Sequence, residues 1–273
     1  MTIRFLLLPA TLACATLAAA QTPPAAPNPN ARFFQALTGV NAINTASIVY
    51  SGLGTAVVPG AKKRTLQPVT KFTVAINYGM QALRMEIEEL NKPKRVEQFL
   101  ADGKAWDVID KKTVARPDAV AERVRLMFMT PQGVMKAAQD AGNKRVMANE
   151  IIDGTLVTTM VFPADGAMLK AYLDDSAMIA RVHTMAGDAT MGKTVVEFLY
   201  TGYKDHDPDK SPKPAPGSKP GAGPPNAGIP FPSHIVQKID GEVVLDIMVT
   251  EVTPNVGLVL EVPPSVERAS GRK

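Results

Sequence analysis

One stretch of the sequence has the residue types and spacing of a nucleotide-binding loop. Gly187–Thr194, GDATMGKT, has two glycines separated by four residues and followed by Lys and Thr. Such a loop binds phosphate because it begins a helix, whose amino end presents unpaired N–H groups. The residues that follow, VVEFLYTGY, are rich in β-branched and aromatic side chains and predict a strand instead. We therefore interpret the match as a hairpin turn and predict no nucleotide site.

An acidic run has nearly the spacing of a calcium-binding loop. Asp205, Asp207 and Asp209 occupy alternate positions, as the first ligands of an EF-hand loop do. That loop needs Gly at the next position and an acid at its twelfth, where this chain has Lys210 and Pro216. We interpret the run as part of a solvated loop.

The histidines give neither a metal-binding nor a catalytic pattern. His183, His206 and His234 stand far apart, with no second ligand at metal-binding spacing. His183 alternates with Arg181 on a face that we expect to be exposed to solvent. The sequence also has no Gly-x-Ser-x-Gly elbow and no histidine beside a candidate serine. We predict a protein that is not an enzyme and that has no metal and no cofactor.

Methionine provides the positive signal. The chain has 13 Met, one Trp and only 5% aromatic residues. Flexible thioether side chains suit a cavity that accepts acyl chains of variable shape, although ordinary core filling is the alternative for any single Met. We predict an apolar ligand site lined by Phe72, Ile76, Leu83, Met85, Ile87, Met127, Phe128, Met135 and Met160.

Strands must position the first five of these residues. Residues 69–78 and 82–90 each alternate apolar with polar side chains, and the runs meet at Gly79, which predicts an antiparallel pair. Residues 96–110 predict a second pair that turns at Asp102–Gly103. Alternation sends every second side chain of these strands toward the interior.

Two central helices must position three of the methionine and phenylalanine candidates. Asp118 is predicted to cap a helix that continues through Phe128. Thr130 and Pro131 predict the start of another helix, which we expect to end at Gly142. Met127, Phe128 and Met135 then lie on the stripes that face the interior.

A shorter helix is predicted near the amino terminus. Asn30 is expected to cap a helix over residues 31–40. Phe33, Leu37 and Val40 have helical spacing and are predicted to form its buried stripe.

A Pro- and Gly-rich stretch, Asp207–Gly228, interrupts the second half of the chain. Strand-like runs precede it from residue 154 onward, including the one that contains Met160. Two more runs, 233–239 and 242–252, follow it and meet at Asp240–Gly241. Because 45 residues without cysteine could scarcely fold alone, we predict that these strands complete the preceding sheet. The Pro/Gly stretch is then a disordered loop within one domain.

The beginning of the chain predicts export. Residues 1–20 combine a basic start at Arg4, an apolar run and small residues before Gln21, as a cleaved secretory signal does. Cys14 suggests a lipoprotein cut as the alternative, but Thr11 does not fit such a site. Removing the signal lowers the formal charge from +4 to +3, too mild for a nucleic-acid binder. We predict a periplasmic or secreted chain without a transmembrane segment.

These boundaries give one organisation for the chain. We predict a signal peptide over 1–20, a disordered leader over 21–30 and a single domain over 31–265. The disordered Pro/Gly loop is placed at 206–227 and a basic tail at 266–273.

The order of these elements resembles the LolA/LolB-like fold of periplasmic lipoprotein carriers. The resemblance implies a mainly β protein with a few helices (α+β). A strongly curved antiparallel sheet would form a half-open barrel, plugged by the central helices around an apolar cavity. In addition, Met129–Ala138 (MTPQGVMKAA) and Tyr200–Asn255 (YTGYKD to EVTPN) resemble the non-catalytic region that precedes the metallo-β-lactamase-like domain of some exported bacterial proteins. The hydrolase domain itself is absent, so no zinc chemistry is implied.

Two functional hypotheses follow. The first is an exported protein that binds a lipid, acyl chain or other apolar ligand inside the half-barrel. The alternative is an interaction module that docks another exported protein, such as a separately encoded metallo-hydrolase. A continuous cavity favours the first hypothesis, and a filled barrel with an exposed apolar patch favours the second.

Overall fold

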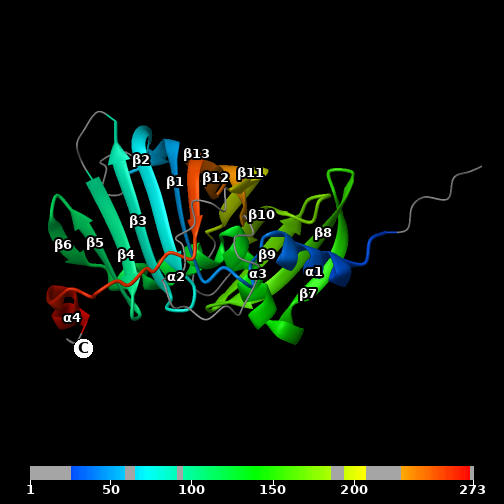
Figure 1. The fold of residues 1–273 in the computed structure, drawn as a ribbon, viewed down its shortest axis with the longest axis horizontal. Helices are drawn as coiled ribbons and strands as arrows, with labels where there is room; N and C mark the ends of the chain where they lie inside the picture. Colours follow the sequence, from blue (N-terminus) through cyan, green and yellow to red (C-terminus); the bar gives the residue numbers. More distant parts are fainter. Residues whose placement is uncertain (1–25, 59–64, 91–94, 186–193, 207–228, 271–273) are drawn as a thin grey trace, which may run out of the picture.

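The protein is built on one antiparallel sheet of 13 strands, shown here in a computed structural model (Figure 1). The structure describes residues 26–58, 65–90, 95–185, 194–206 and 229–270. The strands are β1 (Ser47–Val57), β2 (Leu66–Asn77), β3 (Ala82–Glu89), β4 (Arg95–Ala101), β5 (Lys104–Ile109), β6 (Lys112–Ala115), β7 (Val146–Ile152), β8 (Thr155–Ala164), β9 (Ala167–Leu173), β10 (Ile179–Thr184), β11 (Val196–His206), β12 (Ile229–Ile239) and β13 (Glu242–Pro254). Their order in the sheet is β6-β5-β4-β3-β2-β1-β13-β12-β11-β10-β9-β8-β7.

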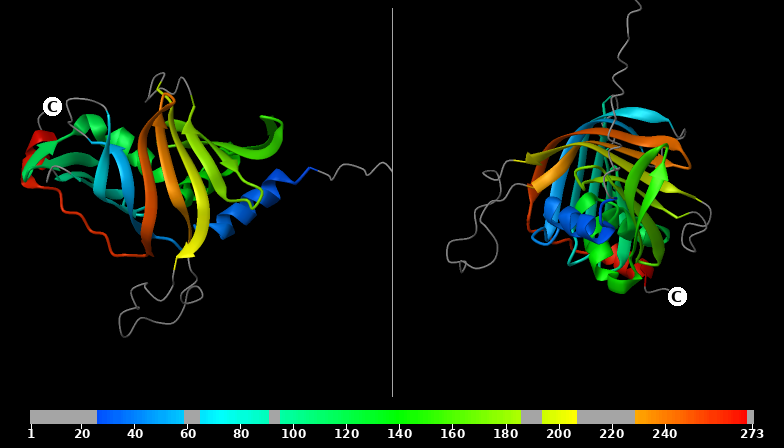
Figure 2. Two further views of the ribbon diagram at one scale, coloured as in Figure 1. Left: turned by 90° about the horizontal axis from the view of Figure 1, so that it is seen from above. Right: turned by 90° about the vertical axis from the view of Figure 1, so that its right-hand side faces the viewer.

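The sheet is strongly curved but not closed. β6 and β7 are its two ends, and in the described part of the chain they do not pair with each other. Figure 2 shows the strands wrapping around helices that lie on the concave side. The predicted class, a mainly β half-barrel that encloses helices, is therefore confirmed.

Strands on the two sides of the Pro/Gly stretch are neighbours in the sheet. β11 pairs with β12 over ten residue pairs, and β13 pairs with β1 across the middle of the sheet. The stretch itself, residues 207–228, lies outside the described residues, so its predicted disorder stays a prediction. His206 is the last residue of β11.

Asp-Gly pairs make the predicted tight turns. Asp102–Gly103 joins β4 to β5, and Asp240–Gly241 joins β12 to β13. All four residues have positive φ, between 49° and 85°. Two-residue hairpins of this hand need positive φ at both positions, which Asp and Gly adopt at little cost.

β1 does not appear in the sequence pattern because two glycines interrupt it. A Cβ built at Gly52 would lie only 2.5 Å from the Met248 carbonyl oxygen of β13. The pairing register between β1 and β13 also shifts between Ser51 and Gly52. The glycine thus permits a close approach and a bulge, which breaks the alternation that would identify a strand.

Four α-helices accompany the sheet in the described residues. They are α1 (Pro29–Gly39), α2 (Val120–Phe128), α3 (Pro131–Asp140) and α4 (Pro264–Ser270), with short 3-10 turns at Pro117–Ala119 and Gly142–Lys144. α1 packs against α3, β7 and β8, whereas α2 packs against β3, β4 and β5. None of the helices described is long and apolar enough to cross a membrane.

The predicted cap of α1 is displaced by two residues. Asn28, not Asn30, accepts hydrogen bonds from the first free N–H groups, those of Asn30 and Ala31. Pro29 then occupies the first helical position, where its missing N–H and fixed φ are favourable. Phe33, Leu37 and Val40 are buried, as their spacing predicts.

The predicted cap of α2 is wrong, whereas that of α3 is confirmed. A 3-10 turn precedes α2, and the Asp118 carboxylate accepts hydrogen bonds from Arg116 instead of the helix N–H groups. Thr130 caps α3 by accepting from the Gly133 N–H, and Pro131 follows it. α3 ends at Asp140, just before Gly142.

The residues predicted as a basic tail include a packed helix. Val266 of α4 is 1% exposed and belongs to a small second core with Trp106 and Ala101. α4 contacts β5 and β6 at one end of the sheet (Figure 1). The helix therefore packs beside the edge strand β6, three of whose four residues remain exposed.

Candidate functional site

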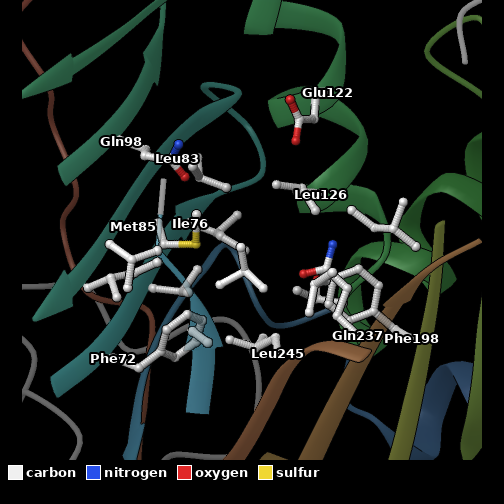
Figure 3. Close-up of a pocket in the computed structure, with 18 of the residues that line it drawn as sticks. Phe72, Ile76, Leu83, Met85, Gln98, Glu122, Leu126, Phe198, Gln237 and Leu245 are labelled. Carbon is white, nitrogen blue, oxygen red and sulfur yellow. The ribbon is translucent and has the colours of Figure 1, made fainter. Parts of the chain in front are cut away.

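A cavity of about 430 Å³ lies between the concave face of the sheet and α2. Strands β1, β2, β3, β12 and β13 form most of its wall, and α2 lies across it (Figure 3). Its lining is mainly apolar: Tyr50, Ala56, Val57, Val58, Phe72, Val74, Ile76, Leu83, Met85, Ile87, Leu126, Phe198, Ile239, Val244 and Leu245. Gln98, Arg116, Glu122, Thr130 and Gln237 add polar groups.

The register of β2 and β3 brings the predicted strand residues together. Ile76 pairs with Leu83, and Phe72 pairs with Ile87, with Met85 between them on the same face. All five line the cavity, as the alternation predicts. The Met85 sulfur lies near the centre of the view in Figure 3.

The other four predicted residues lie elsewhere. Met127, Met135 and Met160 are 0% exposed and fill the hydrophobic core, and Phe128 is half-buried against that core. None of the four lines the cavity. The three methionines fill the core, because the periodicity of a helix or a strand shows which face is covered but not whether the covered space is empty.

α2 faces the cavity with a different stripe from the predicted one. Glu122 and Leu126, which are four residues apart and so share one side of the helix, line the cavity (Figure 3). The sequence pattern points to Val124 and Met127 because these positions are apolar. A search for a mixed polar and apolar stripe would have found the pair.

A buried ion pair holds α2 over the cavity. The Arg123 guanidinium donates hydrogen bonds to the carbonyls of Phe99 and Trp106, each at 2.7 Å, and to the carboxylate of Asp107. Burial lowers the pKa of Arg123, and the neighbouring Asp107 opposes that shift. Asp107 also accepts from Arg116 at 2.7 Å, so its buried carboxylate serves two cations.

The junction of α2 and α3 is attached to both sides of the cavity. The hydroxyl of Tyr78, the residue that follows β2, lies 2.8 Å from Thr130 Oγ1. On the other side, the Tyr200 hydroxyl of β11 donates to the Met129 carbonyl. Burial raises the pKa of both tyrosines, so the phenols stay protonated and can serve as donors at neutral pH. These contacts fix α2 in place without filling the space beneath it.

The other chemical motifs are separate from this cavity. Within the described part of the chain, no cluster of three or more His, Cys, Asp or Glu residues could hold a metal. His183 is half-buried rather than exposed, because its ring packs on Tyr172 with 3.1 Å between Nε2 and the hydroxyl. Most of Gly187–Thr194, and Asp207 and Asp209, lie outside the described residues.

Comparison with known proteins gives matches among solved structures only. No protein-family model and no curated protein matches the sequence. The chain is similar to a LolA superfamily protein from Nitrosomonas europaea, with a TM-score of 0.49 and 10% identity over 88% of this chain and 97% of that one. It is similar to a DUF1329 family protein from Desulfovibrio piger, with a TM-score of 0.47 and 9% identity over 85% and 96% of the chains.

A third similar structure is that of LprF from Mycobacterium bovis, with a TM-score of 0.30 and 12% identity over 86% and 99% of the chains. The resemblance to LolA-like proteins predicted from the sequence is thus found again among solved structures. The resemblance to the region before a metallo-β-lactamase-like domain stays a prediction. All these similarities concern the course of the backbone, so the function is inferred from the cavity itself.

Proposed function

We propose that this chain is a non-enzymatic binding protein that holds a lipid, acyl chain or other apolar ligand in the cavity between the sheet and α2. The observation that carries the proposal is the lining of that cavity, in which apolar side chains from both halves of the chain converge on about 430 Å³. Pockets for small molecules commonly measure about 300–1,000 Å³ and combine apolar walls with a few polar groups. The volume and the lining of this cavity both fit that description.

The proposal includes the place of action. The first 20 residues have the pattern of a cleaved secretory signal, so we place the protein in the periplasm or outside the cell. The intact mass of the exported protein tests this placement, which requires a chain beginning at Gln21. A lipid attached to Cys14 would contradict it.

A cavity-filling variant tests the binding site. Met85→Trp adds a ring on the inner face of β3, where the existing space can accept it. We expect the variant to stay folded and to lose most binding of Nile red, a neutral apolar dye whose fluorescence reports a dry environment. Dye titration of the wild type and the variant measures the change.

Met248→Trp is the matched control. Met248 lies on the outer face of β13, where it is 53% exposed, so the same substitution leaves the cavity unchanged. Dye binding should match that of the wild type. Equal loss in both variants, or no dye binding by the wild type, would contradict a ligand site in this cavity. The interaction module would then become the favoured hypothesis.

A further inference from the structure

Some polar side chains of the cavity already form hydrogen bonds or ion pairs with other protein groups, and others do not. Besides the Tyr50 phenol, five polar side chains line the cavity: Gln98, Arg116, Glu122, Thr130 and Gln237. A polar group without a partner, whether half-buried like Gln98 and Gln237 or exposed like Glu122, can bond to a ligand without the loss of an internal hydrogen bond.

Arg116, the only cation among these lining residues, is already neutralised. Its Nη1 donates to Asp107 at 2.7 Å, and its Nε and Nη2 donate to both oxygens of Asp118 at 3.1 and 2.9 Å. The hydrogen bond to Asp118 is the main cause that raises the pKa of Arg116. Arg116 and Arg123 are therefore balanced by two carboxylates, and neither cation is left for an acidic ligand.

Thr130 is also engaged. Its hydroxyl donates to the Met127 carbonyl at 2.8 Å and accepts from the Gly133 N–H at 3.3 Å. The Tyr78 hydroxyl lies 2.8 Å away. A ligand could bond to Thr130 only by displacing contacts that hold the junction of α2 and α3.

Three of these five side chains remain available. Gln98, Glu122 and Gln237 make no side-chain hydrogen bond or ion pair within the residues that the structure describes. In Figure 3, Gln98 and Glu122 lie toward one end of the apolar lining and Gln237 lies beside Phe198. The available set is thus one carboxylate, two neutral amides and the Tyr50 phenol, whose hydroxyl makes no hydrogen bond within the described residues, and Glu122 is its only charged member.

From this set we propose that the cavity selects amphiphiles whose polar end donates hydrogen bonds and carries no negative charge, such as an alkyl amine or alcohol, over amphiphiles with an acidic end. An ionised Glu122 accepts hydrogen bonds but cannot donate them, and it repels a second anion. The amides can accept from an amine or hydroxyl and can also donate to a carboxylate, so the charge of Glu122, not the amides, makes the distinction. This inference rests on the proposed function and specifies its ligand class.

Chain-matched ligands test the selection. Dodecylamine, dodecanol and dodecanoate carry the same alkyl chain, and each can compete with Nile red at pH 7 below its micelle concentration. We expect dodecylamine to displace the dye at about tenfold lower concentration than dodecanoate, a difference that corresponds to about 1.4 kcal/mol. Dodecanol should lie between them.

A single charge change then assigns the selection to Glu122. Glu122→Gln should reduce, by several-fold, the ratio of the concentrations at which dodecanoate and dodecylamine displace the dye. Glu122→Lys should make dodecanoate the tighter ligand. Glu251→Gln is the matched control, because Glu251 is exposed on β13 and makes no ion pair in the described residues. It should leave the ratio unchanged.

The outcomes separate this inference from the proposed function. If all three ligands displace the dye equally, or if Glu122→Gln and Glu251→Gln have the same effect, the headgroup selection is wrong and the apolar site stands. If the dye binds wild type and Met85→Trp equally, both the site and the selection are wrong. Dodecanoate binding tighter than dodecylamine would also overturn the selection.

Discussion

The two halves of the curved sheet hold their helices by different means. Over β7–β10, α1 and α3 are packed against apolar side chains, and Phe162, Leu169 and Met135 are completely buried. Over β1–β3 and the neighbouring β12 and β13, α2 leaves a cavity of about 430 Å³. We refer to these regions as the filled half and the hollow half.

The difference does not come from helix length, since α2 has nine residues and α3 has ten. α3 buries Val134, Met135 and Ala138 completely, so apolar contact holds it. α2 also buries Val124 and Met127, but it is held in addition by the Arg123–Asp107 ion pair and by the fixed junction at Thr130. A helix secured by polar contacts at defined points can span a space without filling it, and this is how the fold keeps a cavity.

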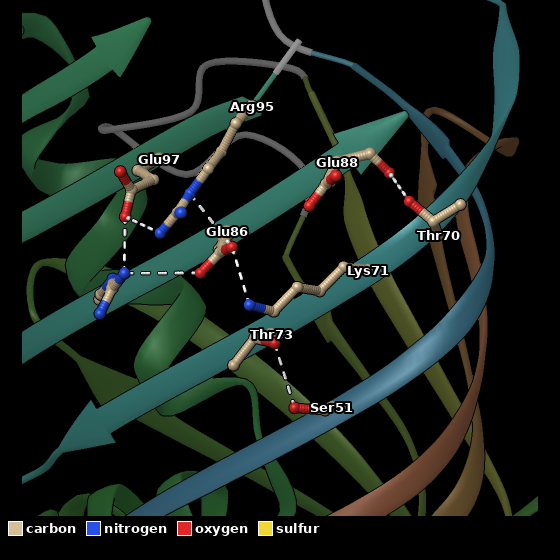
Figure 4. Close-up of polar contacts among 9 residues, drawn as sticks. Ser51, Thr70, Lys71, Thr73, Glu86, Glu88, Arg95 and Glu97 are labelled. Carbon is tan, nitrogen blue, oxygen red and sulfur yellow. Dashed lines mark hydrogen bonds and ion pairs between the residues drawn. The ribbon is translucent and has the colours of Figure 1, made fainter. Parts of the chain in front are cut away.

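The outer face of the hollow half carries a compensating network (Figure 4). Glu86 of β3 is almost fully buried beneath Lys71 at 3.0 Å and Arg95 at 3.1 Å, which come from the two neighbouring strands. Glu97 accepts from Arg84 at 2.7 Å and from Arg95 at 3.0 Å. Cross-strand pairs of opposite charge stabilise a sheet from its outer face, here opposite the region where inner packing is incomplete.

The strongest test of the comparison removes the polar attachment of α2. Asp107→Ala leaves Arg123 buried without its carboxylate, and breaking a buried pair in this way costs about 3–5 kcal/mol of unfolding free energy. Urea denaturation measures the loss. Asp118→Ala is the control, because it removes the other partner of Arg116 at an exposed position and should cost at most about 1 kcal/mol. Similar losses in both variants would show that packing, not the ion pair, holds α2.

A second test compares the same truncation in the two halves. Phe162→Ala creates a new void in the filled half and should cost about 3–5 kcal/mol. Phe72→Ala enlarges a cavity that already exists, so fewer contacts are lost and the cost should be lower, about 2 kcal/mol. Unfolding free energies of the two variants, measured under the same conditions, give the difference. A loss of unfolding free energy for Phe72→Ala that equals or exceeds the loss for Phe162→Ala would contradict the claim that packing around Phe72 is incomplete.

The smallest expected effect concerns the outer network. Glu86→Gln keeps the shape of the side chain but removes the charge that Lys71 and Arg95 share, and should cost roughly 1–3 kcal/mol. Glu88→Gln, two residues along the same strand, removes a carboxylate that forms no ion pair in the described chain and should change stability by less than about 0.5 kcal/mol. Denaturation at low and high salt distinguishes the two: only the loss at Glu86 should shrink as salt rises. Identical behaviour would show that the network does not support the sheet.

The sequence by itself determined the local structure and part of the cavity wall. Alternation identified β2 and β3 and thus five residues that line the cavity, because the period of a strand fixes which side chains share a face. The Asp-Gly turns and the Thr130 cap were likewise readable, since each depends on backbone preferences of a few neighbouring residues.

Only the tertiary structure decided which covered faces are filled and which are hollow. Met127 and Met85 both follow an apolar period, yet Met127 is enclosed by neighbours and Met85 borders the cavity. The pairing of β1 depends on the close approach of β13 at Gly52. The position of α2 depends on the ion pair between Arg123 and Asp107 of β5, and the periodicity of neither element indicates that these two residues meet. Periodicity indicates which side chains of an element share its inner face. Whether the space beside that face is empty depends on how far apart distant elements are held, and only the folded chain determines that distance.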